Sequence, residues 1–267
     1  MIEYILSFVL GLIIGSFINC IVYRVYNNKS FFKGRSECPK CGHKLEVLDL
    51  IPLISFLSLK GKCRYCNKEI SKEYPLVELC TGFLFLGVSY FLNASFLTQG
   101  FLTLDFLNLL FCFFITTCFI LIFVFDYKWL IIPDGVTFTG IGVTLIYLFS
   151  NTFILNAMTL DELLVRVLTS FIVFLFFFAL YFFSDKKAMG FGDVKLVILL
   201  GLLLGFPNII PALFLAFALG AVIGLLSMKF KKLGLKSEIP FGPFLVVGAF
   251  IALFFGNYLV EWYLNLT

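Results

Sequence analysis

The sequence predicts an all-α polytopic membrane protein with about eight transmembrane helices and a small cytoplasmic domain between the first two. Of its 267 residues, 61% are hydrophobic and only 13% are charged, and Phe alone occurs 37 times. Soluble domains carry roughly 45–50% apolar and ~25% charged residues. Segments such as Phe171–Phe183 are apolar without a break, whereas the strands of a membrane β-barrel alternate apolar and polar residues. The predicted spans are therefore helices.

Eight stretches of the chain approach or reach the ~20 apolar residues that a spanning helix needs. In order they are Ile5–Tyr23, Leu76–Leu97, Leu104–Phe125, Trp129–Phe149, Leu163–Phe183, Val194–Phe206, Ile209–Met228 and Phe241–Leu264. The first is read as a retained helix, because its positive charges follow the apolar run and no small-residue cleavage site is evident. The sixth is only ~20 Å long against a ~30 Å hydrocarbon core. We expect it to lie in a locally thinned or protein-lined region.

The basic residues predict the orientation of these helices. When the chain is threaded through eight spans, the segments on one side contain every Lys and Arg except Arg166 and Lys195. These segments are 24–75, 126–128, 184–193 and 229–240. The side rich in Lys and Arg is the cytoplasm in most membrane proteins, so we expect both termini to face outward.

One hydrophilic segment is long enough to fold by itself. The chain is therefore predicted to consist of a first transmembrane helix over 1–24, a cytoplasmic domain over 25–75 and a seven-helix core over 76–267. A domain of ~50 residues buries little core and usually needs a disulfide or a metal ion to fold.

The cytoplasmic segment contains two C-x-x-C pairs, Cys38/Cys41 and Cys63/Cys66. Thiolates at this spacing bind one side of a tetrahedral ion, and two pairs complete a four-sulfur structural zinc site. Disulfides are disfavoured in a reducing cytoplasm, so we favour Zn²⁺ over ordinary reduced or redox cysteines. His43 could replace one thiolate, but a surface histidine is the simpler interpretation.

Ionisable groups within or at the ends of spans are costly and often functional, and four carboxylates in such positions stand out. They are Glu78, Asp126, Asp134 and Asp193. Asp126 ends the third predicted span and Asp193 begins the sixth, so both lie at the cytoplasmic face. Two carboxyls at one depth on different helices can share a proton, as aspartic-protease chemistry requires.

Asp134 and Asp193 each also have a purely structural interpretation. Asp134 follows Pro133 at a helix start, where an acid complements the helix dipole, and Asp193 is a possible N-cap after Gly192. Two glycines in Gly190-Phe191-Gly192-Asp193 favour a functional role for Asp193, because they let the backbone approach a substrate or a partner helix closely.

The order of motifs resembles that of bacterial prepilin peptidases, the type 4 leader peptidases among the GxGD intramembrane aspartyl proteases. The resemblance covers the chain from end to end. Its motifs are Gly15-Ser16-Phe17-Ile18-Asn19, the paired C-x-x-C loop, Tyr74-Pro75-Leu76-Val77-Glu78, Asp126 with Pro133-Asp134, the Gly190–Asp193 segment followed by Lys195-Leu196, and Ile239-Pro240-Phe241-Gly242-Pro243.

The resemblance implies an enzyme of the bacterial plasma membrane with two activities. It would cleave the basic leader of type IV prepilin or pseudopilin precursors after Gly, and then methylate the new N-terminus with S-adenosylmethionine. Pilus assembly, type II secretion and competence all use such precursors. Asp126 and Asp193 match the family's catalytic pair, and the four cysteines match its zinc-binding loop. We expect contact with membrane lipid but not with nucleic acid.

Supporting roles are expected for residues beside the catalytic pair, namely Gly190, Gly192, Asp134 and Lys195. Helix dipoles favour an ionised Asp193 at a helix N-terminus and a protonated Asp126 at a C-terminus. No glycine-rich Rossmann turn is present to bind the methyl donor. Tyr74 and Glu78 are candidates for lining its site, although Glu78 is also interpretable as a helix-initiating acid.

Two other classes of function fit the sequence less well. A proton- or cation-coupled transporter with a zinc-stabilised regulatory domain would spread its acidic residues through the bilayer depth, and would often show an inverted repeat. An assembly scaffold would give no reason for the Gly190–Asp193 motif. Serine or cysteine protease chemistry is disfavoured, because the single histidine, His43, belongs to the cysteine cluster.

Overall fold

The computed structural model describes residues 1–267 except 28, 31–33, 94–102, 185–188, 232–238 and 267. It forms two compact units, Met1–Leu121 and Ile122–Thr267, with the boundary inside helix α5 (Leu104–Trp129). Each unit is described by itself. The predicted division at residues 24 and 75 is a finer one and stays a prediction.

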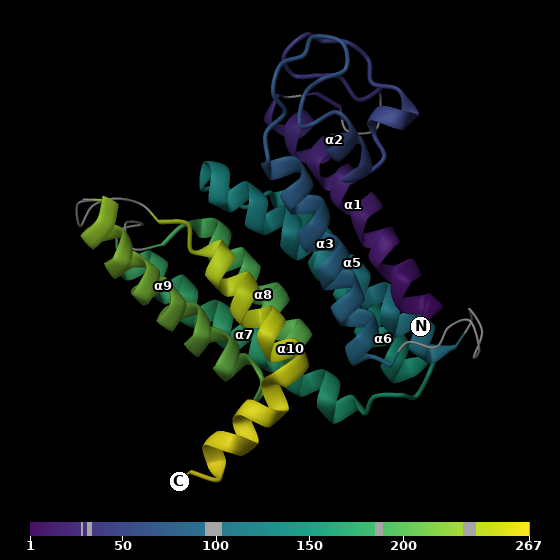
Figure 1. The fold of residues 1–267 in the computed structure, drawn as a ribbon. Coiled ribbons are helices and arrows are strands. Elements are labelled where there is room, and N and C mark those ends of the chain that lie inside the picture. The colour runs from purple at the N-terminus through teal and green to yellow at the C-terminus, as the bar shows by residue number, and fades with distance from the viewer. Residues whose placement is uncertain (28, 31–33, 94–102, 185–188, 232–238, 267) are drawn as a thin grey trace. The chain divides into compact units, whose positions relative to one another are not determined.

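The first unit contains α1 (Ile2–Tyr26) and α3 (Glu73–Phe91), which lie side by side (Figure 1). The two backbones approach closely at Gly11, where a Cβ atom would lie 2.7 Å from the carbonyl oxygen of Thr81. Small residues at such contacts are typical of helix pairs in membranes, because close approach increases van der Waals contact. A buried hydrogen bond of 2.7 Å from the Ser89 hydroxyl to that of Ser7 adds to the contact.

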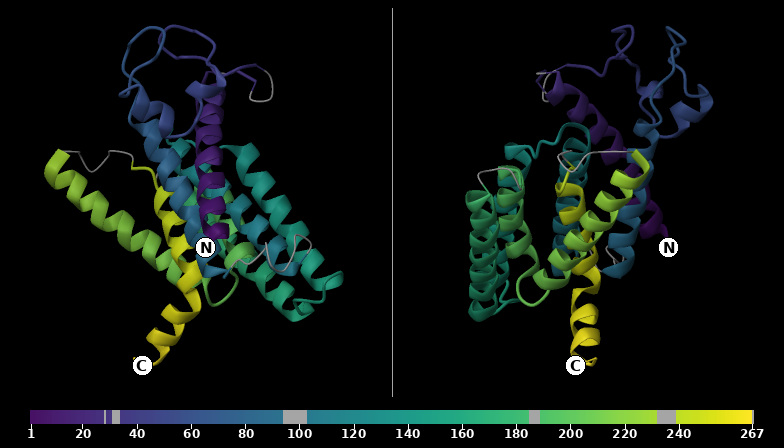
Figure 2. Two further views of the ribbon diagram at one scale, coloured as in Figure 1. Left: turned by 45° about the vertical axis from the view of Figure 1, so that its right-hand side comes forward. Right: turned by 90° about the vertical axis from the view of Figure 1, so that its left-hand side faces the viewer.

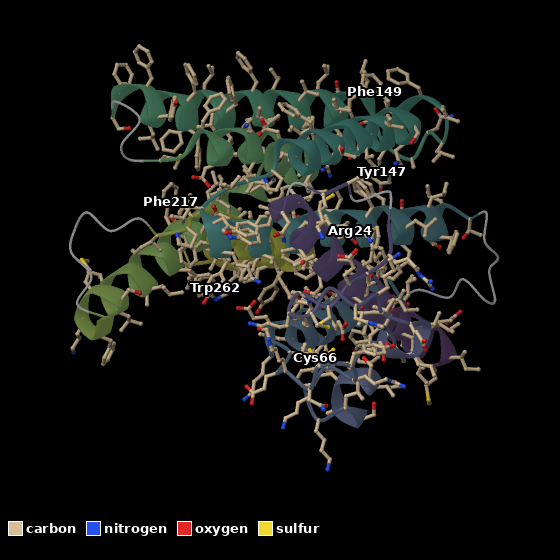
Figure 3. The ribbon with its side chains drawn as sticks, turned by 90° about the horizontal axis from the view of Figure 1, so that it is seen from above. Arg24, Cys66, Tyr147, Phe149, Phe217 and Trp262 are labelled. Atoms are coloured by element: carbon tan, nitrogen blue, oxygen red, sulfur yellow. The ribbon has the colours of Figure 1, made fainter. Side chains whose placement is uncertain are left out.

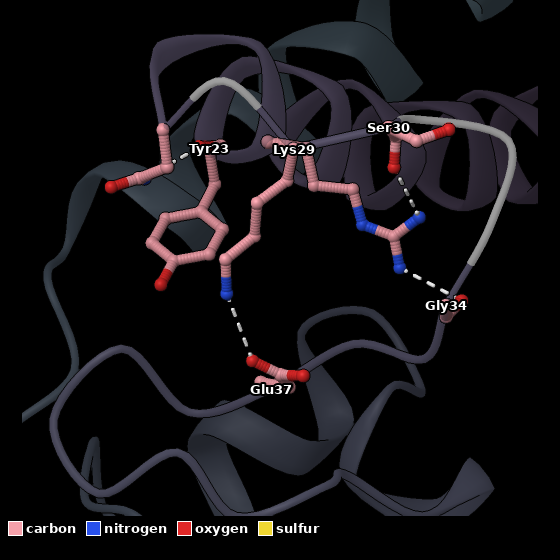
Figure 4. A network of polar contacts seen from close by, with 7 residues as sticks. Tyr23, Lys29, Ser30, Gly34 and Glu37 are labelled. Atoms are coloured by element: carbon pink, nitrogen blue, oxygen red, sulfur yellow. Dashed lines mark hydrogen bonds and ion pairs between the residues drawn. The ribbon is translucent and has the colours of Figure 1, made fainter.

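The segment between α1 and α3 contains two short helical turns, η1 (Val47–Asp49) and α2 (Ile54–Ser58). Polar contacts connect it to the end of α1, where the Arg24 guanidinium donates to the carbonyl oxygen of Gly34 at 3.0 Å (Figure 4). The Lys29 ammonium and the Glu37 carboxylate form an ion pair at 3.1 Å in the same region (Figure 4). Such contacts orient the polar segment relative to the helix that precedes it.

The second unit is built from five helices and the end of α5. They are α6 (Asp134–Phe153), α7 (Leu160–Phe183), α8 (Phe191–Leu204), α9 (Ile209–Lys231) and α10 (Gly242–Leu264). Helix α8 packs against α6, α7, α9 and α10 (Figure 2), and its side chains are buried almost throughout. Aromatic side chains such as Phe149 and Trp262 are half exposed on the surface of the unit (Figure 3).

Polar side chains of α7 bind the backbone at the C-terminal half of α8. The Arg166 guanidinium donates to the carbonyl oxygens of Leu202, at 3.3 Å, and of Leu203. One turn along α7, the Ser170 hydroxyl donates to the carbonyl oxygen of Ile198 at 2.9 Å. The last four carbonyls of a helix lack partners within the helix, so Arg166 caps α8. This contact explains why one arginine lies away from the basic segments.

The helices agree with the predicted spans, with shifted ends. Among the described residues, seven helices are long and apolar enough to cross a membrane. The eighth, α8, has 14 residues and a length of ~21 Å, as its short apolar run predicted. The fourth span begins at Asp134 rather than Trp129, because α5 continues through Trp129.

Parts of the predicted pattern fall outside the described residues. They are the end of the second span, 94–97, and the basic residues Lys33, Lys186, Lys187, Lys232 and Lys236.

Candidate active site and metal centre

The two C-x-x-C pairs lie on loops of the same shape. In the first, the N–H of Gly42 donates to the carbonyl oxygen of Cys38 at 2.8 Å, and in the second the N–H of Asn67 donates to that of Cys63 at 2.9 Å. Gly42 and Asn67 have positive φ angles of 70° and 55°, the left-handed conformation that glycine and asparagine adopt most readily. An antiparallel β-bridge closes each loop, so the segment contains a structural repeat that the C-x-x-C spacing predicted only in part.

These loops bring the four cysteine sulfurs together. The Sγ atoms of Cys38, Cys41, Cys63 and Cys66 all lie within 4.8 Å of one another. Zinc bound by thiolates has Zn–S distances of about 2.3 Å and tetrahedral geometry, which requires sulfurs a little under 4 Å apart. The donor set therefore fits a tetrahedral, coordinatively closed metal site.

His43 is not a member of this cluster. Its ring packs against that of Tyr65 in a tilted arrangement, with 3.6 Å between the ring centroids and 31° between the ring planes. The Tyr65 hydroxyl donates to the Asp49 carboxylate at 3.0 Å, and Arg64 pairs with the same carboxylate at 2.8 Å. His43 thus packs between the two loops, in agreement with the simpler interpretation of a surface residue.

The thiols differ in acidity. A backbone hydrogen bond at His43 acts to lower the pKa of Cys41, but desolvation and the neighbouring thiols of Cys38 and Cys66 outweigh it and raise that pKa to about 11. Desolvation acts to raise the pKa of Cys63, but backbone hydrogen bonds at Cys66 and Tyr65 outweigh it and lower that pKa to about 7. In the metal-free protein at neutral pH, Cys41 is therefore a thiol and Cys63 is partly a thiolate.

In the second unit, Asp126 and Asp193 line one cavity of about 390 Å³. Asp126 lies in the last turn of α5 and Asp193 in the first turn of α8. Their exposed fractions are 5% and 7%, and the two carboxyls interact electrostatically. Ionising both of two buried carboxyls that face one cavity costs considerable free energy. The two groups can instead share one proton.

The N-terminus of α10 binds one of these carboxyls. The backbone N–H of Gly242, the first residue of α10, donates to Oδ2 of Asp126 at 2.8 Å. The predicted contrast between the aspartates considered only the helices that contain them. Since Asp126 also meets a helix N-terminus, which favours a carboxylate, dipoles no longer distinguish an acid from a base.

The glycines of the Gly190–Asp193 motif have different surroundings. Gly190 is the N-cap of α8, so Asp193 is its third residue and not the N-cap considered from the sequence. A Cβ atom on Gly192 would lie 3.0 Å from Cβ of Ile132, which lines the same cavity. One on Gly190 would lie 3.5 Å from Oδ2 of Asp193, an ordinary contact. Only Gly192 thus lies where a side chain would be crowded.

Asp134 and Lys195 also line the cavity and form an ion pair with each other. Asp134 is the first residue of α6, as its position after Pro133 predicted. The Lys195 ammonium lies 5.3 Å from the centre of the Phe191 ring and 6.0 Å from that of Phe138. The pair therefore connects the beginnings of α6 and α8 beside the aspartates.

Glu78 and Tyr74 lie in the first unit, on α3. Glu78 is the sixth residue of α3, so it does not initiate the helix. It is buried, and its carboxylate accepts the N–H of Leu53 at 2.9 Å and a hydrogen bond from Ser16. The carbonyl oxygen of Tyr74 accepts the side-chain amide of Asn19 at 3.0 Å. These contacts connect α3 to α1 and to the polar segment.

Gly242 at the cavity and Arg166 at the opposite end of α8 have contacts that the sequence did not predict. Gly242 belongs to the quoted Ile239–Pro243 motif, but its bond to Asp126 joins positions 116 residues apart. Arg166 stood out only as an exception to the charge pattern. In both cases the sequence marked the residue as unusual, by a motif or by its charge, but only the tertiary structure identified its hydrogen-bond partner.

Comparison with known proteins places the chain in a family. Residues 9–92 match the bacterial peptidase A24 N-terminal domain, and residues 112–225 match the type IV leader peptidase family. The prepilin leader peptidase/N-methyltransferase of Vibrio cholerae serotype O1 is 32% identical in an alignment of 264 positions, which covers 94% of this chain and 96% of that protein. The chain belongs to the type IV leader peptidase family.

Other members of the family are similar over the same extent. Prepilin leader peptidase/N-methyltransferases of Aeromonas salmonicida and Pseudomonas aeruginosa are 30% and 28% identical. Each alignment covers 97% of this chain, and 93% and 92% of the respective relative. No solved structure matches. The family predicted from the motifs is confirmed, and membership indicates a multi-pass membrane peptidase with methyltransferase activity rather than a transporter.

Proposed function

We propose that this protein removes the basic leader of type IV prepilin or pseudopilin precursors by cleavage after Gly, and then methylates the new N-terminus. The observation that carries the peptidase proposal is the cavity lined by Asp126 and Asp193. Family membership supports both activities, because the relatives are named as prepilin leader peptidases and N-methyltransferases.

The two aspartates divide the work of hydrolysis between them. One carboxylate takes a proton from water as the water oxygen bonds to the peptide carbon, while the other carboxyl gives its proton to the carbonyl oxygen. The C–N bond then breaks: the leaving nitrogen takes the proton that the first carboxyl accepted from water, and a hydroxyl of the intermediate returns a proton to the second carboxylate as the product carboxyl group forms. Burial of both carboxyls strengthens these electrostatic interactions.

The proposed location is the bacterial plasma membrane, with the aspartates and the cysteine segment at the cytoplasmic face and both termini outside. The distribution of Lys and Arg supports this orientation. A precursor with its apolar segment in the membrane and its basic leader in the cytoplasm would place the scissile bond level with Asp126 and Asp193. The short α8 would thin the barrier that water must cross.

We assign the cysteine cluster to Zn²⁺ in a structural role. Four thiolates leave no open coordination position for water or substrate. Cys38, Cys41, Cys63 and Cys66 would hold the ion, and the ion would fix two loops of a segment with little core of its own.

S-adenosylmethionine is the proposed methyl donor. Tyr74 and Glu78 stay the proposed candidates for lining its site. The Glu78 carboxylate accepts hydrogen bonds from Leu53 and Ser16, and the carbonyl oxygen of Tyr74 accepts one from Asn19, which leaves further carboxylate lone pairs and the Tyr74 side chain for a ligand. No methyl-transfer step is assigned to either residue.

The proposed catalytic pair is tested by Asp126→Asn and Asp193→Asn, made separately and assayed for precursor cleavage in membranes. We expect each variant to lose cleavage by at least about a thousandfold, because an amide can neither accept the proton of water nor share one. Methylation of a product peptide that has already been cleaved serves as the control for folding. Near-normal cleavage by either variant would contradict the assignment of Asp126 and Asp193 as the catalytic pair.

A further inference from the structure

We propose that Gly242 is a positioning residue for the peptidase reaction, holding the Asp126 carboxyl toward the cavity through its backbone N–H and its lack of a side chain. This inference rests on the proposed function. It concerns the Ile239–Pro243 motif, for which neither the hydrolysis scheme nor the metal site provides a role.

The first step of the argument is the hydrogen bond. Gly242 begins α10, and the N–H groups at the start of a helix have no acceptor within it. The next residue, Pro243, has no N–H at all. The N–H of Gly242 is buried and meets Oδ2 of Asp126 at 2.8 Å, so each group satisfies the other in a region where an unpaired polar group is costly.

The second step is the space around the Gly242 Cα atom. A Cβ atom there would lie 2.7 Å from Oδ2 and 3.1 Å from Cγ of Asp126, and 3.2 Å from Cδ1 of Ile132. All three atoms belong to side chains that line the cavity. A methyl group would therefore displace the carboxyl of Asp126 rather than the backbone of α10.

The third step is the consequence for the reaction. The bond from the Gly242 N–H to Oδ2 fixes the orientation of the Asp126 carboxyl group. Its other oxygen, Oδ1, is thereby held in a fixed position beside the cavity that Asp193 of α8 also lines. Holding a catalytic group in place contributes strongly to rate, and a displacement of about 1 Å can cost roughly 100-fold. Substrate binding uses the membrane segment and the leader, so we expect it to be affected far less.

The test uses the full-length protein in detergent with a prepilin-type precursor, and compares Gly242→Ala with two other glycine variants. Gly142→Ala, in α6, adds a methyl group where no other atom lies within 4 Å. Gly248→Ala lies further along α10, where its Cβ atom would be 2.3 Å from the carbonyl oxygen of Ala212. This variant stresses helix packing without touching Asp126.

Three readouts separate positioning from folding: kcat and KM for cleavage, methylation of an already cleaved product, and thermal unfolding. For Gly242→Ala we expect kcat to fall about 100-fold with KM within about twofold of wild type. Its methylation and unfolding temperature should stay near wild type. Gly142→Ala should change nothing, and Gly248→Ala should lower both activities together with stability.

A wild-type kcat for Gly242→Ala would overturn the inference. So would a parallel loss of cleavage, methylation and folding like that of Gly248→Ala. If the wild-type protein does not cleave the precursor, the proposed function itself fails. If the wild type cleaves, Asp126→Asn does not and Gly242→Ala does, then only the role of Gly242 is wrong.

Discussion

At the scale of single residues, the aspartate cavity shows how little space surrounds the groups that line it. A Cβ atom on Gly192 or on Gly242 would lie 3.0 or 3.2 Å from the side chain of Ile132, closer than an ordinary contact, whereas one on Gly190 would make only an ordinary contact. The two glycines of one four-residue motif therefore have different physical reasons to be glycine. This difference gives a direct test.

We predict that Gly192→Ala lowers precursor cleavage by roughly 10- to 100-fold. The added methyl group would overpack the contact with Ile132, and overpacking costs about 1–3 kcal/mol. Gly190→Ala should change cleavage by less than about threefold, since its Cβ atom makes only ordinary contact and its backbone angles, φ −72° and ψ 145°, suit any residue. The measurement is kcat for the two variants side by side. Equal losses at both positions would contradict the packing argument.

At the scale of elements, α8 is a helix too short to span a bilayer, and its C-terminal carbonyls need partners inside the protein. Arg166 on α7 supplies a donor for Leu202 and Leu203, and Ser170 donates to the carbonyl oxygen of Ile198 earlier in the helix. In a region without water, backbone groups must be satisfied internally. Arg166 therefore satisfies carbonyl groups at the end of α8 that have no partner within the helix.

We predict that Arg166→Met lowers the free energy of unfolding by about 1–3 kcal/mol, the usual range for losing hydrogen bonds from a charged donor. Arg166→Lys should recover part of the loss, because an ammonium also donates to carbonyls. Thermal unfolding of the purified protein in detergent, followed by tryptophan fluorescence, measures the effect. Leu168→Met, at an exposed position on the same helix, is the control. A stability of Arg166→Met equal to that of the control would disprove the cap.

At the scale of the whole molecule, the chain divides into two units with separate candidate sites. The four cysteines lie in Met1–Leu121, and both aspartates lie in Ile122–Thr267. The segment that contains the cysteines has only the short turns η1 and α2 as helical structure. Metal loss should therefore alter this segment while most of the helical structure persists.

We predict that chelation increases protease cleavage between residues 37 and 69 and changes the far-ultraviolet circular dichroism little. A variant with both Cys38→Ser and Cys63→Ser should behave like the chelated protein before chelator is added. A large loss of helical signal on chelation would contradict this prediction.

Metal binding should also release protons, because the ligands are thiolates. Cys41, with a pKa of about 11, is protonated throughout the neutral range, so its proton leaves at every pH from 6 to 8. Cys63, with a pKa of about 7, is mostly protonated only below pH 7. More protons should therefore leave at pH 6 than at pH 8, and affinity should fall as pH falls. Titration calorimetry of zinc binding in two buffers counts these protons, and equal counts at both pH values would be the contrary result.

The sequence by itself determined the class of fold, the approximate spans, the four cysteines that could hold a metal ion, and the family. These features depend on local composition and spacing: apolar runs of known length, two C-x-x-C pairs and six motifs in order. The ends of helices were less certain, as the fourth span shows, because Trp129 to Pro133 is apolar enough to belong to either neighbour. The short length of α8 could be predicted, because the number of consecutive apolar residues sets the distance that a helix can span.

Only the tertiary structure decided which groups meet. The contacts of Gly242 with Asp126, of Arg166 with Leu203 and of Glu78 with Leu53 join residues 116, 37 and 25 positions apart. Periodicity and helix dipoles describe a helix by itself, so they assigned Asp126 the influence of α5 alone and missed that of α10. A buried polar group is satisfied by whatever the fold brings beside it, and no local pattern specifies that partner.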